Sequence, residues 1–319
     1  LGERDDLRPS AAKDAARAVT YWKAMLGAEL DASKLTLDDI ERACEKRRAG
    51  IVNAQGEPVP TDKRRTVRTR AVGADMEALR AAYRWAVLKR KLLDRNPLDG
   101  LEIPEEANPR RPVANTDRYE KTRAVAGQVT MELRGEGKRV QVPSYLPELL
   151  DLAFATGRRL SAILALRYED LRLDVPPFGA LRWAAESDKM GREWTGEINA
   201  TAREAVDRVA VDRELGTRAK WPASPWLFPS PRNPSRPVSK DLASDWLERA
   251  EALAKLPKLD GSLWHAYRRG WATSRKHHPQ ADVAKAGGWK DMQTLARIYQ
   301  QADPETTRRV VLEPRELRG

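Results

Sequence analysis

Four side chains that could act together on a phosphate lie between positions 264 and 300. His265 and Arg268 are three residues apart, and residues at this spacing share one face of a helix. Trp289 follows a pair of glycines, and Tyr299 comes ten residues later. A guanidinium binds two phosphate oxygens at once, and a tyrosine becomes a useful nucleophile when cationic groups or a base assist it. The stretch therefore suggests chemistry on a phosphate, although a surface arginine and a hydrogen-bonded core histidine would explain His265 and Arg268 equally well.

The pattern around these residues predicts how they converge. Residues 282–286 have a short helical pattern, and the glycine pair that follows is typical of a helix end. Apolar residues then recur at helical spacing over 292–299. We therefore expect helix, helix, sharp turn, helix, with Tyr299 brought back over the helix of His265 and Arg268.

Two adjacent arginines lie between two apolar helical patterns within residues 145–171. Gly157 ends the first pattern, and Arg159 opens the second. A helix start presents unpaired backbone N–H groups, which is a suitable setting for a phosphate. The alternative is that Arg158 and Arg159 are exposed residues of a turn.

Short alternating segments at 171–173, 180–183 and 194–198 predict the strands of a small sheet. Residues 188–191 would form the turn between the last two strands, which places Lys189 at the tip of a hairpin. A lysine at such a tip is usually a solvated charge. It could also reach into a groove or an active site.

The first hundred residues have the pattern of a small helical bundle. Amphipathic spacing predicts helices over 10–31, 36–48 and 66–93, the second with Thr36 as its N-cap and the third ending before Pro97. A basic run leads into the third helix, and it fits either a contact with a DNA backbone or a solvated face. Its basic residues are Lys63, Arg64, Arg65, Arg68 and Arg70.

A proline-containing segment separates this bundle from the rest of the chain. Residues 102–115 hold three prolines and few apolar side chains, which is typical of a semi-extended linker. Thr116 then opens another helix. We therefore expect a helical domain over 1–103, a linker over 104–115 and a second domain over 116–319.

The composition favours a polyanionic partner. The 319 residues include 58 Lys and Arg against 47 Asp and Glu, a net charge of +11, which suits nucleic acid first and an acidic membrane surface second. The single cysteine, Cys44, excludes an internal disulfide and, with only three histidines, argues against a metal site. We expect no metal and no cofactor. Because no apolar run of 18 residues and no apolar signal core occur, we expect a cytoplasmic protein, associated with the nucleoid when it binds DNA.

The chain resembles the tyrosine recombinases, or phage-type integrases, in six residues that occur in the family's order. These are Arg159, Lys189, His265, Arg268, Trp289 and Tyr299. Arg159 stands in a Thr-Gly-x-Arg motif, and Trp289 follows a glycine as the family's second histidine or tryptophan does. The resemblance covers nearly the whole chain. It implies a mainly α fold with a small antiparallel β-sheet, made of an N-terminal helical core-binding domain and an α+β catalytic domain.

Three departures from the family pattern stand out. Ala162 occupies the position where the family often has a glutamate, so a carboxylate that could support Arg159 is missing. The interval from Trp289 to Tyr299 is ten residues where nine is common, and Tyr267 stands where leucine is usual. None of these changes removes a reacting group, so we expect an active enzyme.

The resemblance also implies a mechanism. Tyr299 would attack a DNA phosphodiester to give a 3′-phosphotyrosyl link and a free 5′-hydroxyl, without metal or ATP. Arg159 and Arg268 would bind the non-bridging oxygens, and Trp289 would donate a hydrogen bond to the phosphate. Lys189 would protonate the leaving 5′-oxygen, and His265 would assist proton transfer or hold the phosphate.

The implied partners are double-stranded DNA that carries a specific recombination site, and further copies of the chain in a homotetramer on that DNA. The resemblance also allows for an accessory DNA-bending or directionality factor and for a role in DNA integration by a phage or another mobile element. We expect the DNA contacts to come from Lys63, Arg64, Arg65, Arg68, Arg70, Arg110, Arg111 and Arg158.

Two other functions remain open from the sequence. A type IB topoisomerase shares the chemistry but relaxes DNA without strand exchange, and the core-binding domain and compact length favour the recombinase. A DNA-binding accessory protein that has lost catalysis would draw support from Ala162 and the longer interval before Tyr299. A membrane-surface protein fits the charge but not the ordered motifs.

Overall fold

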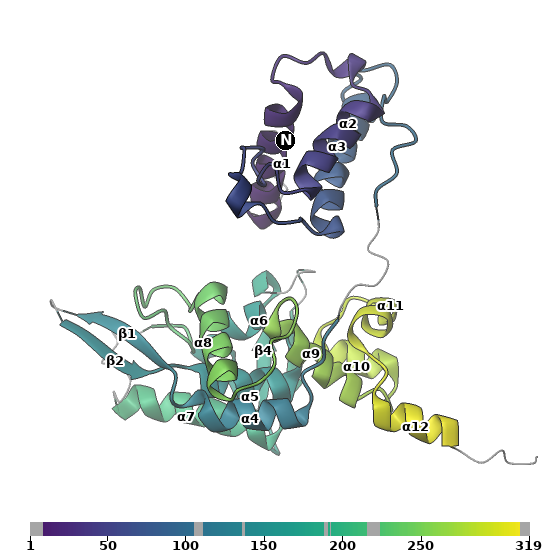
Figure 1. Ribbon diagram of the computed structural model, residues 1–319. Helices are drawn as coiled ribbons and strands as arrows, with labels where there is room; N and C mark the ends of the chain where they lie inside the picture. Colours follow the sequence, from purple (N-terminus) through teal and green to yellow (C-terminus); the bar gives the residue numbers. More distant parts are fainter. Residues whose placement is uncertain are drawn as a thin grey trace, which may run out of the picture. The chain divides into compact units, whose positions relative to one another are not determined.

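The computed structural model describes residues 9–104, 111–135, 138–187, 191, 193–215 and 224–312. The chain divides into two compact units, Leu1–Pro109 and Arg110–Gly319 (Figure 1). The division falls inside the segment for which the sequence predicts a linker. Among the described residues, no helix combines the length and the apolar character that crossing a membrane requires.

The first unit is a small helical bundle. It contains α1 (Pro9–Leu26), α2 (Leu37–Arg48) and α3 (Thr69–Leu88), with the short 3₁₀ turns η1 (Ala32–Lys34) and η2 (Thr61–Lys63). Tyr21, Ile40 and Val72, one from each helix, are fully buried in its core. The side chain of Asp75 lies between Arg17 at 2.7 Å and Arg47 at 3.5 Å, so one buried carboxylate links all three helices.

The ends of these helices show what periodicity predicts well and what it does not. Thr36 is the N-cap of α2 and forms a capping box with Asp39, as the sequence predicts. Helix α1 stops at Leu26 and not at residue 31, because Gly27 takes a positive φ of 88° that ends the helix. Helix α3 ends at Leu88 and not at residue 93, because the backbone leaves the helical conformation before Lys91, whose φ is 51°.

The second unit is built around α5 (Leu146–Thr156), which is buried on nearly all sides. Its neighbours are α4 (Thr116–Ala126), α7 (Ala200–Leu215) and α9 (Leu263–Ser274). Leu146, Leu149, Leu150 and Leu152 of α5 are fully buried, and its two carboxylates, Glu148 and Asp151, are each only 2% exposed. The remaining helical elements are α6 (Leu160–Leu164), η3 (Tyr168–Asp170), η4 (Ala185–Ser187), α8 (Lys240–Leu253), α10 (Gln280–Gly287), α11 (Met292–Thr294), the π-helical turn η5 (Leu295–Tyr299) and α12 (Pro304–Leu312).

Two small antiparallel sheets complete this unit. The predicted strands are present as β3 (Leu171–Arg172), β4 (Ala180–Trp183) and β5 (Trp194–Glu197), in the order β3-β4-β5. The hairpin of β1 (Thr130–Gly135) and β2 (Lys138–Pro143) was not predicted from the sequence, and it extends from the side of the unit opposite α12 (Figure 1). The predicted fold class, mainly α with a small antiparallel sheet, is confirmed.

Gly270 is the point where α9 meets the backbone before α4. A Cβ added there would overlap the carbonyl oxygen of Ala114. We predict that Gly270→Ala lowers the stability of the second unit by about 1–3 kcal/mol, the usual cost of an overpacked core. Calorimetric unfolding checks this.

The matched control is Gly127→Ala. Gly127 has a helical φ of −65° and no atom near the added Cβ, so this change should be neutral or slightly stabilising. Equal unfolding midpoints for the Gly270 variant and the wild-type protein would contradict the packing described here.

Candidate active site

Helix α9 carries two of the predicted site residues, His265 and Arg268, and is fixed from several sides. The indole of Trp264 donates to the carbonyl of Ala243 on α8 at 3.3 Å, and that of Trp271 donates to the carbonyl of Ala155 on α5 at 3.0 Å. The side chains on α9 therefore project from a rigid support.

The guanidinium of Arg268 is buried at the meeting point of two helix ends. It is 2% exposed, and it donates to the carbonyls of Gly157, of Gly287 at 2.7 Å and of Gly288 at 3.5 Å. These carbonyls belong to the C-terminal ends of α5 and α10, where a helix carries partial negative charge. The backbone thus supplies much of the counter-charge for this buried cation.

Burial lowers the pKa of Arg268 to about 9, with contributions in the same direction from the positive charges of Arg159 and Arg158. Tyr299 acts in the opposite direction. Arg268 therefore remains a cation at neutral pH.

Two aromatic rings cover this guanidinium. Its central carbon lies 3.7 Å from the ring centroid of Trp289 and 5.1 Å from that of Tyr299. Trp289 and Tyr299 meet edge to face at 4.9 Å, and the rings of Tyr299 and His265 are 6.3 Å apart. The structure therefore brings His265, Arg268, Trp289 and Tyr299 together in one place, with Tyr299 over α9.

Two buried N–H donors in this cluster have no hydrogen-bond partner among the described residues. They are Nε1 of Trp289 and Nε of Arg268. Leaving a buried donor unsatisfied costs about 1–3 kcal/mol. Since both groups can only donate, an anion bound at the cluster would remove that cost.

Arg159 joins the cluster from the turn between α5 and α6. It stands at the N-cap position of α6, and its guanidinium donates to the carbonyl of Gly288 at 3.1 Å. Arg159 and Arg268 thus share one backbone acceptor. Ala162, where the family often has a carboxylate, is buried.

The neighbouring Arg158 has a different environment. It is buried, and its guanidinium lies over the indoles of Trp194 at 4.2 Å and Trp183 at 5.0 Å. These two tryptophans are directly paired across β4 and β5. The arrangement favours a structural role for Arg158 over the predicted contact with DNA.

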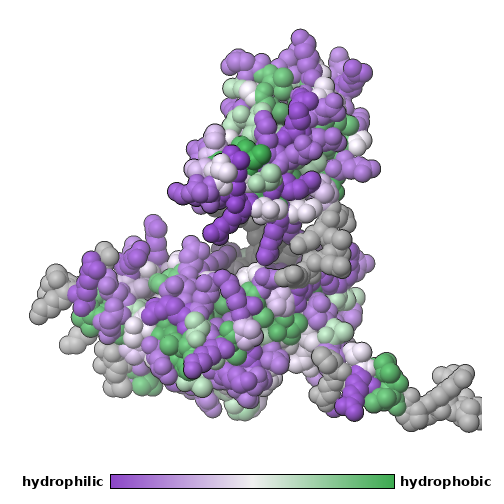
Figure 2. Space-filling view, in the orientation of Figure 1, coloured by the Kyte–Doolittle hydropathy of each residue, from purple (hydrophilic) through white to green (hydrophobic). Residues whose placement is uncertain are grey.

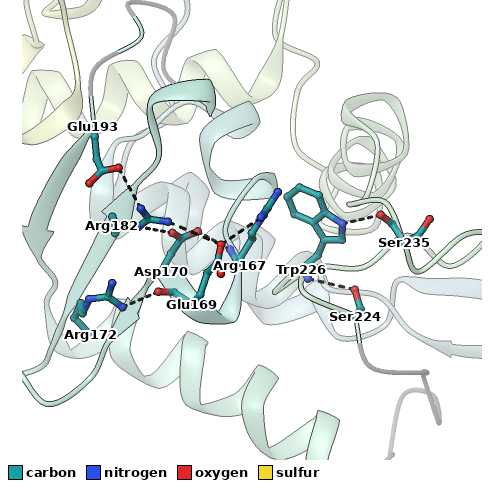
Figure 3. A network of polar contacts seen from close by, with 9 residues as sticks. All are labelled: Arg167, Glu169, Asp170, Arg172, Arg182, Glu193, Ser224, Trp226 and Ser235. Atoms are coloured by element: carbon teal, nitrogen blue, oxygen red, sulfur yellow. Dashed lines mark hydrogen bonds and ion pairs between the residues drawn. The ribbon is translucent and has the colours of Figure 1, made fainter.

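Lys189 lies outside the described residues, and so does Arg110. A polar network holds the strands on either side of the Lys189 segment (Figure 3). Arg182 on β4 donates to the buried Asp170 at 2.8 Å and to Glu193 at 3.1 Å. The other oxygen of Asp170 accepts from the backbone N–H of Arg167 at 2.9 Å, which ties β4 to the chain after α6.

His265 is neutral at physiological pH. Although the residue is exposed, the protein packed around its ring lowers its pKa to about 4, and the charges of Arg268, Arg269, Arg159 and Lys240 add to this effect. Arg269 and Lys240 were not among the site residues predicted from the sequence. Arg269 adjoins the His-x-x-Arg motif, but nothing in the sequence signals that Lys240 lies near it.

The predicted DNA-contacting residues of the first unit are all exposed, in the turn and loop that lead into α3 and in its first turn. Arg111, in the second unit, is half-buried and donates to the carbonyl of Arg297. The exposed residues are Lys63, Arg64, Arg65, Arg68 and Arg70.

Within the described parts of the chain, no group of three His, Cys, Asp or Glu side chains could hold a metal ion.

The chain is similar to known proteins both in sequence family and in fold. Residues 138–306 match the phage integrase family. A lambda integrase dimer bound to a COC′ core site has a TM-score of 0.67 at 16% identity, covering 95% of this chain and 76% of that chain. The Tn1549 transposon integrase in complex with circular intermediate DNA has a TM-score of 0.67 at 13% identity, covering 97% and 95%. A lambda integrase tetramer bound to a Holliday junction has a TM-score of 0.68 at 16% identity, covering 94% and 74%. No curated protein sequence matches the chain.

The low pKa of His265 predicts a pH dependence of stability. The folded value of about 4 lies below the unfolded value near 6.5, so the unfolded chain binds more protons between these two pH values. The wild-type protein should therefore lose stability as the pH falls from 6.5 to 4. His265→Gln should lose less over the same window, as measured by denaturant unfolding at a series of pH values. Parallel pH profiles for the two proteins would show that His265 titrates normally.

Proposed function

The chain belongs to the phage integrase family, and from that premise we propose that it is a site-specific recombinase that cleaves and rejoins DNA through Tyr299. The observation that carries this proposal is the convergence of Tyr299 with Trp289 and Arg268 around two unsatisfied buried donors. A hydroxyl nucleophile beside an anion-binding cluster is the arrangement that attack on a phosphodiester needs.

In the proposed cleavage step, the hydroxyl oxygen of Tyr299 attacks the scissile phosphorus. The bond from phosphorus to the 5′-oxygen breaks, leaving a 3′-phosphotyrosyl link and a free 5′-hydroxyl. The neutral His265 has an unprotonated ring nitrogen, and the negative charge of a bound phosphate would offset the nearby cations so that this nitrogen can accept the phenolic proton. We assign protonation of the leaving 5′-oxygen to Lys189, on the family resemblance.

The cations of the cluster would stabilise the charge that develops on the phosphate. Arg268 donates hydrogen bonds to backbone carbonyls, and these bonds fix its guanidinium. Its Nε remains to donate to the phosphate. Nε1 of Trp289 and the guanidinium of Arg159 would complete the set. Because the phosphotyrosyl bond conserves the energy of the phosphodiester, attack by a partner strand's 5′-hydroxyl rejoins the DNA without ATP, and we propose that no metal is required.

We propose double-stranded DNA that carries a specific recombination site as the partner. The net charge of +11 and the exposed basic run of the first unit support this, since most affinity for DNA comes from phosphate contacts. The lambda and Tn1549 integrases of similar fold were solved bound to DNA.

We further propose a homotetramer on that DNA. The lambda integrase tetramer on a Holliday junction has a similar fold. Helix α12 exposes three consecutive apolar residues, Val310, Val311 and Leu312, at 64–74% (Figure 2), and this surface suits a neighbouring protomer. A type IB topoisomerase would share the cleavage chemistry but would not exchange strands, so strand exchange separates the two activities.

We predict that the wild-type protein forms an SDS-resistant adduct with DNA in EDTA and that Tyr299→Phe does not, because the variant lacks the attacking oxygen. Supercoiled plasmid and a pool of random-sequence nicked duplexes serve as substrates, and the trapped adducts themselves report the cognate sequence. Tyr83→Phe is the control, since the hydroxyl of Tyr83 only donates to Ala32 in the first unit. An adduct that persists in Tyr299→Phe would refute the assignment of the nucleophile.

The unsatisfied indole donor gives a second prediction. Trp289→Phe keeps an aromatic ring but removes Nε1, so the rate of adduct formation should fall by about 10²–10³-fold while DNA affinity is retained. Trp226→Phe is the matched control, because its Nε1 donates to Ser235 at 3.0 Å away from the cluster. Equal rates for the two variants would mean that Trp289 contributes only packing.

A further inference from the structure

A buried polar cluster lies behind the active-site helix and joins it to two others. Arg118 on α4 makes a bidentate pair with Glu251 on α8, at 2.8 and 2.6 Å. Tyr267 on α9 lies within hydrogen-bond distance of Glu251 at 3.2 Å and of Thr122 at 2.9 Å. Tyr267 is fully buried, and the other three residues are at most 7% exposed.

The hydrogen atoms in this cluster can be assigned from its partners. Thr122 donates its hydroxyl hydrogen to the carbonyl of Arg118 at 2.8 Å, so its oxygen is left to accept. The carboxylate of Glu251 also accepts only. Burial raises the pKa of Tyr267 well above its ordinary value, so the phenol stays protonated. Its single hydrogen is therefore shared between Glu251 and Thr122.

Tyr267 is placed to control the rotation of α9. Successive residues of a helix are about 100° apart, so Tyr267 points away from the face that His265 and Arg268 share. The hydroxyl at the end of its rigid ring is hydrogen-bonded to Thr122 on α4 and Glu251 on α8. A small rotation of α9 would move Arg268 off the carbonyls of Gly287 and Gly157, and the anchor behind the helix opposes such a rotation.

We propose that Tyr267 is a positioning residue for the reaction, holding Arg268 and His265 in register with Tyr299 through its hydroxyl bonds to Glu251 and Thr122. This inference rests on the proposed function. The pair of Arg118 and Glu251 does not need Tyr267, since Arg118 satisfies the carboxylate by two bonds and also donates to the carbonyl of Pro257 at 2.8 Å. Loss of the hydroxyl should therefore preserve the fold and loosen the helix.

The test compares Tyr267→Phe with Tyr119→Phe. The hydroxyl of Tyr119 on α4 also donates to a buried carboxylate, that of Asp151 at 2.9 Å, but this contact does not involve α9. Adduct formation and DNA affinity are measured on the sequence recovered from trapped adducts, once with a phosphodiester and once with a neutral methylphosphonate at the scissile position. A neutral phosphonate needs less charge stabilisation from Arg268.

Tyr267→Phe should slow adduct formation by about 10–100-fold on the phosphodiester, the scale of a 1 Å misplacement, with DNA affinity within twofold of wild type. The loss should shrink on the methylphosphonate, and Tyr119→Phe should show no such difference. A Tyr267→Phe rate equal to wild type, or an equal loss on both substrates, would overturn the proposal. Thr122→Val, which removes one of the two acceptors, should give a smaller loss of the same kind.

One readout separates this proposal from the proposed function. The ¹H–¹⁵N resonance of Arg268 Nε can be followed without DNA, and it should shift or broaden in Tyr267→Phe but not in Tyr119→Phe. If the wild-type protein forms no adduct with any DNA, the recombinase assignment fails, and this resonance still reports whether Tyr267 positions α9. An unchanged resonance would then reject the positioning role on its own.

Discussion

The site depends on one constraint, the burial of a guanidinium between the ends of two helices. Arg268 is 2% exposed, and a cation so buried requires compensating negative charge. The carbonyls at the ends of α5 and α10 supply it. Those ends are closed by Gly157 and Gly288, with φ of 61° and 70°, and a Cβ on them would overlap Trp271 and Arg158 respectively. The two glycines therefore allow the helix ends, the cation and the surrounding side chains to approach so closely.

The same constraint explains the electrostatics around Tyr299. Backbone carbonyls occupy part of the Arg268 donor set and fix its plane, while Trp289 and Tyr299 pack against its face. Nε of Arg268 and Nε1 of Trp289 are left without a hydrogen-bond partner among the described residues. Burial, with a further contribution from the nearby positive charges, keeps His265 neutral beside the cluster.

Much of this arrangement follows from local sequence signals. The glycine ends of α5 and α10, the Thr36 cap and the strands β3, β4 and β5 are set by neighbouring residues, and these were predicted. The hairpin of β1 and β2 was missed although Met131, Leu133, Val140 and Val142 alternate along it. Contacts between distant residues left no local signal. The packing of Arg158 over two tryptophans and the cluster of Arg118, Glu251 and Tyr267 depend on how the helices and strands pack. The roles of all the site residues stay predictions, and Lys189 and Arg110 also lie outside the described residues.

The most direct test of the central claim is to observe the two unsatisfied donors when DNA binds. In the Tyr299→Phe protein, which cannot cleave, the ¹H–¹⁵N resonances of Arg268 Nε and Trp289 Nε1 would be recorded with the recovered target duplex. Both resonances should shift with a phosphodiester at the scissile position and shift less with a methylphosphonate there. Tight binding of the duplex with both resonances unchanged would contradict the claim that the buried guanidinium and its covering indole form the phosphate site.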